Sequence, residues 1–344
     1  MTPLVIAHRG ASGYRPEHSR SAYELAIALG ADAIEPDLVP TRDGALVLRH
    51  ENEISGTTDV ADRPEFEDRR TTKTVDGQRL TGWFTEDFTW HELTTLRTRE
   101  RLPQLRPQSA AHDGDEPILR FEDLLGILDA APRSVGLVAE VKHATYFDGV
   151  GLPMGQLVDA AIGAAGWRGD DRLTVECFEK GVLRDLGARG AGGRLVYLQE
   201  TRGSAADEVA THGSSAPTYA TERTDAALAA LADEFDGISV PLGTLMAGVD
   251  PVAVDDPGPV RSDVVERAHA VGLDVYTWTL RPENRFLPAP LRRGGDVAAH
   301  GDWERWYTSV VRTGVDGVFA DHPDLAVRAR ELVADPAAVH RSEG

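Results

Sequence analysis

Short apolar runs alternate with segments of helical periodicity along most of the chain. Nine apolar runs are predicted to be strands: residues 4–7, 33–37, 45–48, 135–141, 173–178, 195–198, 237–240, 275–279 and 317–320. Apolar side chains recur at helical spacing in residues 22–29, 121–130, 156–165, 180–186, 225–235, 262–271, 303–313 and 324–333. This repeated strand-then-helix order predicts an α/β fold with a parallel sheet, and at this length a (β/α)8 TIM barrel.

Two regions depart from this rhythm. The stretch 35–50 is too short to hold a helical crossover, and nine strand candidates exceed the eight strands of a barrel. One strand of this stretch is therefore expected outside the barrel or in a hairpin arm. Prolines predict a long loop after the penultimate strand, at Pro282, Pro288 and Pro290.

Residues 51–116 are polar and rich in Thr, Asp, Glu and Arg, and they include the aromatic residues Trp83, Phe84, Phe88 and Trp90. A structureless loop of this length is uncommon in a compact domain. We therefore predict a small inserted subdomain after the third strand, within a single domain of residues 1–344. Its aromatic side chains are expected to form its own core, and a substrate lid is the alternative.

The first helix is predicted to begin with a capping box at residues 21–24, where the hydroxyl of Ser21 and the carboxylate of Glu24 satisfy the first backbone amides. Gly30 is expected to end this helix. Its predicted apolar face consists of Ala22, Leu25, Ala26 and Leu29.

Composition narrows the classes of function. Hydrophobic residues make up 41% of the 344 residues, and the formal net charge of −20 argues against nucleic acid and anionic membrane surfaces as partners. No apolar run approaches the roughly 18 residues of a membrane span. Cys177 is the only cysteine, so no internal disulfide can form. The chain opens without a basic, apolar leader, so a cytoplasmic protein is expected, or a secreted one if its start was trimmed.

Several predicted strands end in charged or titratable groups. Residues two apart in a strand share a face, and the C-terminal ends of barrel strands meet at one mouth. We therefore expect convergence there, and the alternative is a set of unrelated ion pairs. The seven groups are His8 and Arg9 after the first strand, Glu35 and Asp37 in the second, His50 at the end of the third, where Glu51 follows it, and Glu140 and Lys142 at the end of the fourth.

Three of these residues suggest a metal site. Glu35, Asp37 and Glu140 would form an all-oxygen set suited to a hard divalent cation, Ca²⁺ or Mg²⁺. Without a cation, three converging carboxylates would repel one another and raise their pKa values.

The remaining groups suit phosphate chemistry. The cations Arg9 and Lys142 would help the metal to neutralise a phosphate. His8 and His50 could serve as general acid and general base, because histidine gains and loses protons near pH 7.

The order of these motifs resembles the glycerophosphodiester phosphodiesterase family over nearly the whole chain. Residues 53–59 and 81–88 resemble its longer, bacterial periplasmic-type members. His-Arg-Gly alone would be weak, but the ordered set is highly specific. The matching pieces are His8-Arg9-Gly10, Pro16-Glu17, Ala22 with its helix, Gly30-Ala31-Asp32, Glu35-x-Asp37, Thr41-x-Asp43-Gly44, His50, Glu140-x-Lys142, Trp278-Thr279 and residues 314–321.

The resemblance implies a (β/α)8 barrel and metal-dependent hydrolysis of a small-molecule substrate. Substrates of the family are deacylated phospholipids such as glycerophosphocholine, which yield an alcohol and glycerol 3-phosphate. The implied roles are acid–base catalysis for His8 and His50, phosphate binding for Arg9 and Lys142, and metal binding for Glu35, Asp37 and Glu140.

Three further positions bear on the predicted site. Trp278 lies at a strand end beside the proline-marked loop and is expected to line the pocket, and Glu17 is expected in or beside the site. Where the family commonly has Pro-Glu-Asn-Thr, this chain has His18 and Ser19 at the last two positions. Serine can replace threonine as a helix cap, whereas His18 replaces an amide with a titratable ring and could change the surroundings of the metal or the pH profile.

Two other functions are weighed. A phospholipase D-like lyase would act on intact phospholipid and stop at a cyclic phosphate, but it should carry an apolar or basic interfacial surface that this acidic chain does not show. A non-catalytic barrel that only binds ligand would not need both histidines and all three carboxylates. Head group, metal identity and oligomeric state are not predicted.

Overall fold

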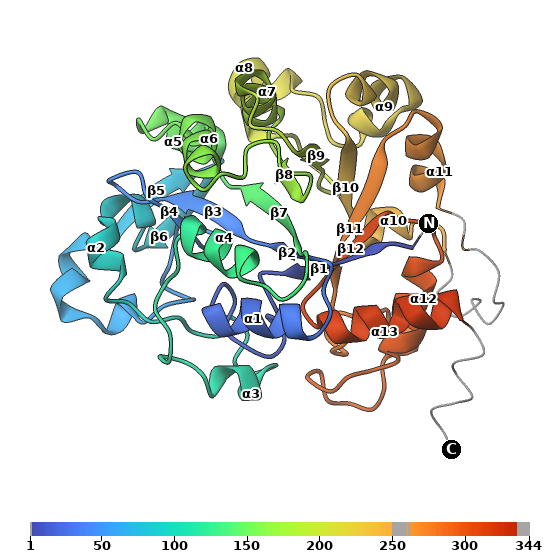
Figure 1. Cartoon of the computed structure of the whole chain (residues 1–344), viewed down its shortest axis with the longest axis horizontal. Coiled ribbons are helices and arrows are strands. Elements are labelled where there is room, and N and C mark those ends of the chain that lie inside the picture. Colours follow the sequence, from blue (N-terminus) through green and yellow to red (C-terminus); the bar gives the residue numbers. More distant parts are fainter. Residues whose placement is uncertain (1, 250–259, 261, 336–344) are drawn as a thin grey trace.

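Eight parallel strands close into a barrel in the computed structural model, which describes residues 2–249, 260 and 262–335 (Figure 1). The predicted domain of 1–344 therefore has ends outside the described residues. The strands follow one another around the barrel in chain order, and the last pairs with the first: β1 Leu4–His8, β2 Ala33–Glu35, β7 Gly136–Val141, β8 Leu173–Cys177, β9 Arg194–Leu198, β10 Gly237–Pro241, β11 Asp274–Leu280 and β12 Gly317–Ala320. The predicted (β/α)8 barrel is confirmed.

The one strand candidate in excess of eight, at residues 45–48, lies outside the barrel as part of a hairpin arm. Pro36 separates β2 from β3 (Asp37–Pro40), and β3 pairs with the antiparallel β4 (Leu46–Leu48). β3 also pairs with β7 through Asp37 and Glu140, so the hairpin begins at the barrel mouth. β3 and β4 pair antiparallel because the connection between them is too short to hold the crossover helix that parallel strands need.

Helices surround the barrel in Figure 1. Those that match predicted segments are α1 Arg20–Ala28, α4 Phe121–Asp129, α6 Met154–Ala164, α7 Lys180–Arg189, α9 Asp225–Ala232, α11 Asp263–Ala270, α12 Trp303–Val311 and α13 Pro323–Ala334. Shorter pieces are α5 Ala144–Gly149, α8 Ala206–His212, α10 Leu242–Leu245, η4 Gly213–Ser215, η5 Thr221–Arg223 and η6 Ala289–Leu291. Within the described ranges, no helix has the length and apolar character needed to span a membrane.

The first helix begins earlier than predicted. Ser19 is its N-cap, because this residue has the extended backbone of a cap and its Oγ accepts the N–H of Ala22 at 3.2 Å. The N–H of Ser21 instead donates to Glu116 at 3.1 Å. The predicted capping box at residues 21–24 was therefore wrong. Leu25 and Leu29 are only partly buried, and the buried face consists of Ala22, Tyr23, Ala26 and Ile27.

The segment between β4 and α4 combines a hairpin with short helical turns. Its aromatic residues pack together: Trp83 Nε1 donates to the carbonyl of Phe66 at 2.6 Å, and the rings of Phe66 and Phe88 lie 5.1 Å apart. Trp83, Phe84 and Phe88 are buried, and the half-buried Trp90 packs against the same main core cluster as Trp83 and Phe88, so these side chains pack as core and do not form a lid. The elements are η1 Val60–Asp62, η2 Pro64–Arg69, β5 Thr71–Val75, β6 Gln78–Gly82, η3 Thr85–Asp87, α2 Trp90–Leu93 and α3 Pro107–Ala110.

A small cluster of side chains, separate from the main core, fills the barrel interior. Successive strand residues point to opposite faces, so Ile6 packs inside while Val5 and Ala7 join the core between strands and helices. Trp278 packs against this interior cluster from the C-terminal end of β11. The cluster consists of Ile6, Ala33, Val138, Val196, Tyr276 and Phe319.

The loop after β1 passes very close to the start of α1. Gly10 has φ of 84°, and a Cβ at this position would lie 2.7 Å from the carbonyl carbon of Ala22. The N–H of Ala11 donates to the carbonyl of Ala22 at 2.8 Å, which holds the contact in place. Gly10 therefore fixes how the loop that carries His8 and Arg9 leaves the strand.

We predict that Gly10→Ala destabilises the fold by more than the roughly 1–2 kcal/mol that a left-handed backbone costs an ordinary residue, because backbone atoms must also move. Gly30→Ala is the matched control, since Gly30 has φ of 90° but a Cβ there would meet only Val327 Cγ2, at 3.9 Å, among the described residues. Urea unfolding of both variants measures the difference. Equal losses of unfolding free energy would show that the close approach at Gly10 is unimportant.

Candidate active site

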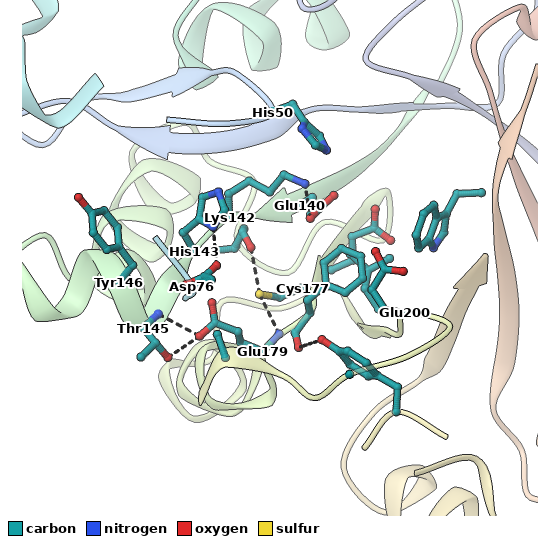
Figure 2. Close-up of a pocket in the computed structure, with 18 of the residues that line it drawn as sticks. His50, Asp76, Glu140, Lys142, His143, Thr145, Tyr146, Cys177, Glu179 and Glu200 are labelled. Carbon is teal, nitrogen blue, oxygen red and sulfur yellow. Dashed lines mark hydrogen bonds and ion pairs between the residues drawn. The ribbon is translucent and has the colours of Figure 1, made fainter. Parts of the chain in front are cut away.

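A cavity of about 740 Å³ opens at the mouth where the barrel strands end (Figure 2). The structure brings together there the seven residues predicted to converge. Asp37 is fully buried beside the cavity. The other six line its wall: His8, Arg9, Glu35, His50, Glu140 and Lys142.

Strand registers bring the carboxylates together. Glu35 pairs with His8 between β2 and β1, and Asp37 pairs with Glu140 between β3 and β7. One oxygen from each of Glu35, Asp37 and Glu140 lies within 4.8 Å of the others, and these three residues are called the acidic triad. Lys142 Nζ lies 2.6 Å from Glu140 Oε1 and 3.0 Å from Asp37 Oδ1.

The acidic triad fits a divalent cation. Glu35 Oε2 accepts the N–H of Arg9 at 2.8 Å, but the buried Oε1 has no hydrogen-bond partner among the described residues. Burial, and then the charge of Asp37, raises the pKa of Glu35 well above its usual value. Burial also raises the pKa of Glu140 to about 8, against the opposing charge of Lys142. The triad is thus short of positive charge, and its oxygen ligands suit Ca²⁺ or Mg²⁺.

Arg9 lies between the triad and Glu17. Its Nε is 3.1 Å from Asp37 Oδ2, and its Nη1 is 3.1 Å from Glu17 Oε2. Glu17 is buried, is also bound by Arg101, and falls outside the described residues that line the cavity. Glu17 therefore lies behind Arg9, beside the cavity wall, with its carboxylate bound by Arg9 and Arg101.

His8 is held in one orientation by Asp321. Its Nδ1 lies 2.6 Å from Asp321 Oδ1. Burial opposes ionisation of Asp321, but Arg281 and Arg106 hold the pKa of this carboxyl well below its usual range. An ionised carboxylate can only accept hydrogen bonds, so His8 Nδ1 carries the proton and Nε2 remains for a substrate. Burial and then Arg9 lower the pKa of His8 to about 4, so its ring is neutral at pH 7.

His50 has the same arrangement with its sequence neighbour. Its Nδ1 lies 2.6 Å from Glu51 Oε1. Burial opposes ionisation of Glu51, but the hydrogen bond from His50 and the charge of Arg101 lower the pKa of this carboxyl. Burial, and then Arg9 and Lys142, lower the pKa of His50 to about 3. Both histidines are therefore neutral at pH 7, with the proton on Nδ1.

His18 is fully buried and is not among the described residues that line the cavity. Its Nε2 lies 3.0 Å from Asp37 Oδ2, and its Nδ1 lies 2.7 Å from the hydroxyl of Tyr23. Burial opposes ionisation of Asp37, but Lys142 and then His50 hold the pKa of this carboxyl well below its usual range. His18 therefore donates to Asp37 and accepts from Tyr23, which leaves neither ring nitrogen for a substrate. Its φ of 60° is left-handed, a region where histidine is commoner than most residues.

The outer wall of the cavity is aromatic and acidic. The ring of Phe178 packs edge-on against Trp278 at 5.9 Å and against Tyr219 at 6.4 Å, and all three line the cavity. The structure thus places Trp278 in the pocket wall. Glu179, drawn with Thr145 in Figure 2, is buried and accepts the N–H of Thr145 at 3.0 Å. Burial raises the pKa of Glu179 to about 7.

Sequence reasoning missed the residues that surround the two histidines. The sequence did mark Asp321, because it ends the family-like motif of residues 314–321, but this motif assigned no role to it. Arg101 and Arg106 had no such signal, because they lie in a polar segment without periodicity. Asp321 binds His8 itself. The other missed residues are Arg106 and Arg281, which bind Asp321, Arg101, which binds Glu51, and Glu283, which binds Arg106.

Two neutral histidines next to an arginine, a lysine and an acidic triad that could hold a cation suit an anion whose reaction needs proton transfer. At the C-terminal mouth of a (β/α)8 barrel, such a site is typical of enzymes that cleave phosphate esters. Comparison with known families makes the assignment specific. The chain belongs to the Glycerophosphoryl diester phosphodiesterase family, whose model matches residues 8–325. The family and enzyme class expected from the sequence are confirmed.

Relatives agree with this membership. The chain is 32% identical to a glycerophosphodiester phosphodiesterase of Arabidopsis thaliana, over 96% of this chain and 86% of the plant protein. The fold is similar to a glycerophosphodiester phosphodiesterase from Agrobacterium tumefaciens, with a TM-score of 0.56, 16% identity and coverage of 95% of this chain and 99% of that one. An Oleispira antarctica phosphodiesterase in complex with the product sn-glycerol-3-phosphate has a TM-score of 0.58, 18% identity and coverage of 96% and 97%.

We predict that the rings of His8 and His50 titrate with midpoints near 4 and 3 in protein treated with chelator. An unperturbed histidine titrates near about 6.5, so on acidification these two rings should stay neutral longer. Histidine NMR signals followed against pH, and assigned with His8→Ala and His50→Ala, measure the midpoints. A midpoint at or above 6.5 for either ring would show that burial and the nearby cations do not disfavour its charged form.

Proposed function

We propose that this chain hydrolyses glycerophosphodiesters, such as glycerophosphocholine, to an alcohol and glycerol 3-phosphate, and that the reaction requires a divalent metal. One observation carries the proposal: two neutral histidines, each held by a carboxylate, line one cavity together with Arg9, Lys142 and the acidic triad. Support also comes from the relative from Oleispira antarctica, which binds sn-glycerol-3-phosphate.

Charge complementarity assigns the binding roles. Arg9 and Lys142 would hold the phosphate oxygens, since both are buried cations at the cavity wall. Glu35, Asp37 and Glu140 would hold the metal, which when bound supplies positive charge to the phosphoryl oxygens. The substrate's glycerol would lie near Trp278, and its head group would extend toward the aromatic and acidic outer wall.

Proton transfer assigns the roles of the histidines. The substrate's own glycerol 2-hydroxyl is placed to attack phosphorus, because an internal nucleophile has a large proximity advantage. One of His8 and His50 takes the proton from this hydroxyl at Nε2. The other, which takes up a proton from solvent at Nε2 when the anionic phosphodiester binds beside it, gives that proton to the oxygen of the departing alcohol. A bond from oxygen to phosphorus forms and the bond to the alcohol breaks, leaving a cyclic phosphate that water then opens to glycerol 3-phosphate.

Product analysis tests the proposal directly. Purified protein with added Ca²⁺ or Mg²⁺ should convert glycerophosphocholine to glycerol 3-phosphate and choline, followed by ³¹P NMR. Accumulation of a cyclic phosphate, or turnover of intact phospholipid alone, would favour the lyase. Binding without turnover would favour a non-catalytic barrel and overturn the proposal.

We expect chelator to abolish activity and Ca²⁺ or Mg²⁺ to restore it. Glu35→Gln should weaken metal binding by more than the roughly 10- to 100-fold typical of changes outside the ligand set, because it removes a ligand charge. Calorimetry of metal binding and thermal unfolding with and without metal provide the readouts. Glu179→Gln is the matched control, a buried cavity carboxylate already bound by Thr145. Full activity after exhaustive chelation would show that the reaction does not require a metal.

His8→Ala and His50→Ala should each lower kcat by about 10² to 10⁴, the usual contribution of a general acid or base, with the fold intact. The double variant should lose less than the product of the two losses, since paired groups act as a unit. His18→Asn should lose far less than either, because His18 offers no nitrogen to the cavity. If His18→Asn is as damaging as His8→Ala, the pair has been assigned wrongly.

A further inference from the structure

One arginine of the inserted segment joins two carboxylates of the site. Arg101 Nη1 lies 2.9 Å from Glu51 Oε1, and its Nη2 lies 2.7 Å from Glu51 Oε2. On its other edge, Arg101 Nε and Nη2 lie 2.7 Å from the two oxygens of Glu17. Glu51 holds His50 and Glu17 holds Arg9, so this single guanidinium contacts the carboxylate behind each of them.

A second arginine, five residues later, reaches the other histidine. Arg106 Nη2 lies 2.6 Å from Asp321 Oδ2, whose partner atom Oδ1 binds His8. Arg106 Nε lies 2.7 Å from Glu283 Oε1, and its Nη1 donates to the carbonyl of Ser12 at 3.1 Å. Each of its three guanidinium nitrogens is engaged in a buried environment, since only 6% of the side chain is exposed. Its direction is therefore fixed.

A tight turn sets the spacing of the two arginines. The carbonyl of Leu102 accepts the N–H groups of Leu105 and Arg106, both at 2.9 Å. The start of the turn is tied to the rest of the inserted segment, because Arg99 N–H donates to the carbonyl of Thr57 at 2.9 Å. Arg101 and Arg106 thus stand on one rigid loop, and each points to a different carboxylate–histidine pair.

The arginines change what the carboxylates do to the histidines. A carboxylate with no other cation would stabilise the charged form of the imidazole it touches and would be free to rotate. Here the second oxygen of Asp321 is taken by Arg106 and Arg281, and both oxygens of Glu51 contact Arg101. Each carboxylate is therefore partly neutralised and kept in place, which leaves the histidine neutral with its proton on Nδ1.

We propose that Arg101 and Arg106 are positioning residues for the two proton carriers: acting through Glu51 and Asp321, they orient His50 and His8 and set the nitrogen that faces the substrate. The proposal rests on the proposed function, because it assumes that these histidines move protons. It makes the inserted segment part of the catalytic apparatus of the barrel. The alternative is that both arginines only fasten the inserted segment to the barrel.

Arg106→Gln is the clearest test of the proposal, because Arg106 binds Asp321 and Asp321 binds His8. We expect kcat to fall about 10²-fold, the scale of a misplacement transmitted from outside the chemistry, while KM stays unchanged. Arg101→Gln should also lower kcat, and it should raise KM because Glu17 loses the partner that holds it against Arg9. Arg99→Gln is the control from the same segment, because the Arg99 side chain pairs with the exposed Asp62, away from both histidines, and should leave kcat and KM unchanged.

A double-mutant cycle separates positioning from fastening. In a His8→Ala background, Arg106→Gln should cost no further kcat, because the group it positions is already absent. In a His50→Ala background, Arg101→Gln should likewise cost no further kcat. If either arginine change costs as much without its histidine as with it, the arginines only fasten the segment and the proposal is overturned. If His8→Ala and His50→Ala themselves leave activity intact, the proposed function fails instead.

Asp321→Asn gives a second route should Arg106→Gln fail to fold. Two arginines donate to Oδ2, so the asparagine oxygen should stay with them and its NH₂ group should face His8. His8 would then carry its proton on Nε2, the reverse of the native state. We expect kcat to fall by up to about 10⁴, as it does when the same Asp→Asn change in a Ser-His-Asp triad gives the wrong histidine tautomer. Nitrogen chemical shifts of the His8 ring report the tautomer. An unchanged tautomer together with unchanged kcat would contradict the proposal that Arg106 positions His8 through Asp321.

Discussion

The burial of three carboxylates at one end of the barrel is the constraint on which the rest of the site depends. Glu35, Asp37 and Glu140 lie within 4.8 Å of one another in a place where water screens them poorly. Lys142 and Arg9 offset part of this charge, yet one Glu35 oxygen has no hydrogen-bond partner among the described residues. A metal cation would balance the rest of this charge, so the repulsion that makes the triad costly also makes it suited to hold one.

This balance also determines the state of the histidines. Burial, and then the cations that offset the triad, disfavour a charged imidazole at His8 and His50, and both rings stay neutral. Each ring is then held by a carboxylate, which would bring yet more negative charge to the mouth. Arginines from the inserted segment balance Glu51 and Asp321 in turn. The charge of the triad is thus linked, through the histidines and their carboxylates, to arginines in a segment that is not part of the barrel.

The inserted segment therefore has several physical roles. Its buried aromatic residues give it a packed interior, and the turn of its hairpin at residues 76–78 adds to the cavity wall. Its arginines bind carboxylates at the barrel mouth. Because the barrel interior is filled by side chains, the substrate site can lie only above it, among the loops and this segment. The shape of the cavity and the orientation of the carboxylates that hold His8 and His50 consequently depend on the same insertion.

Local patterns in the sequence determined the barrel, the order of its helices, and the pairs of charged residues at its strand ends, because periodicity and spacing of two act over a few residues. Such patterns placed the first cap at Ser21 when the loop geometry selects Ser19, and they left open which strand lies outside the barrel. Tertiary structure alone joined His8 to Asp321, 313 residues away, and brought Arg101 to Glu17 and Glu51. Those contacts depend on where loops end after the barrel closes, and no local pattern records a distance between segments far apart in the chain.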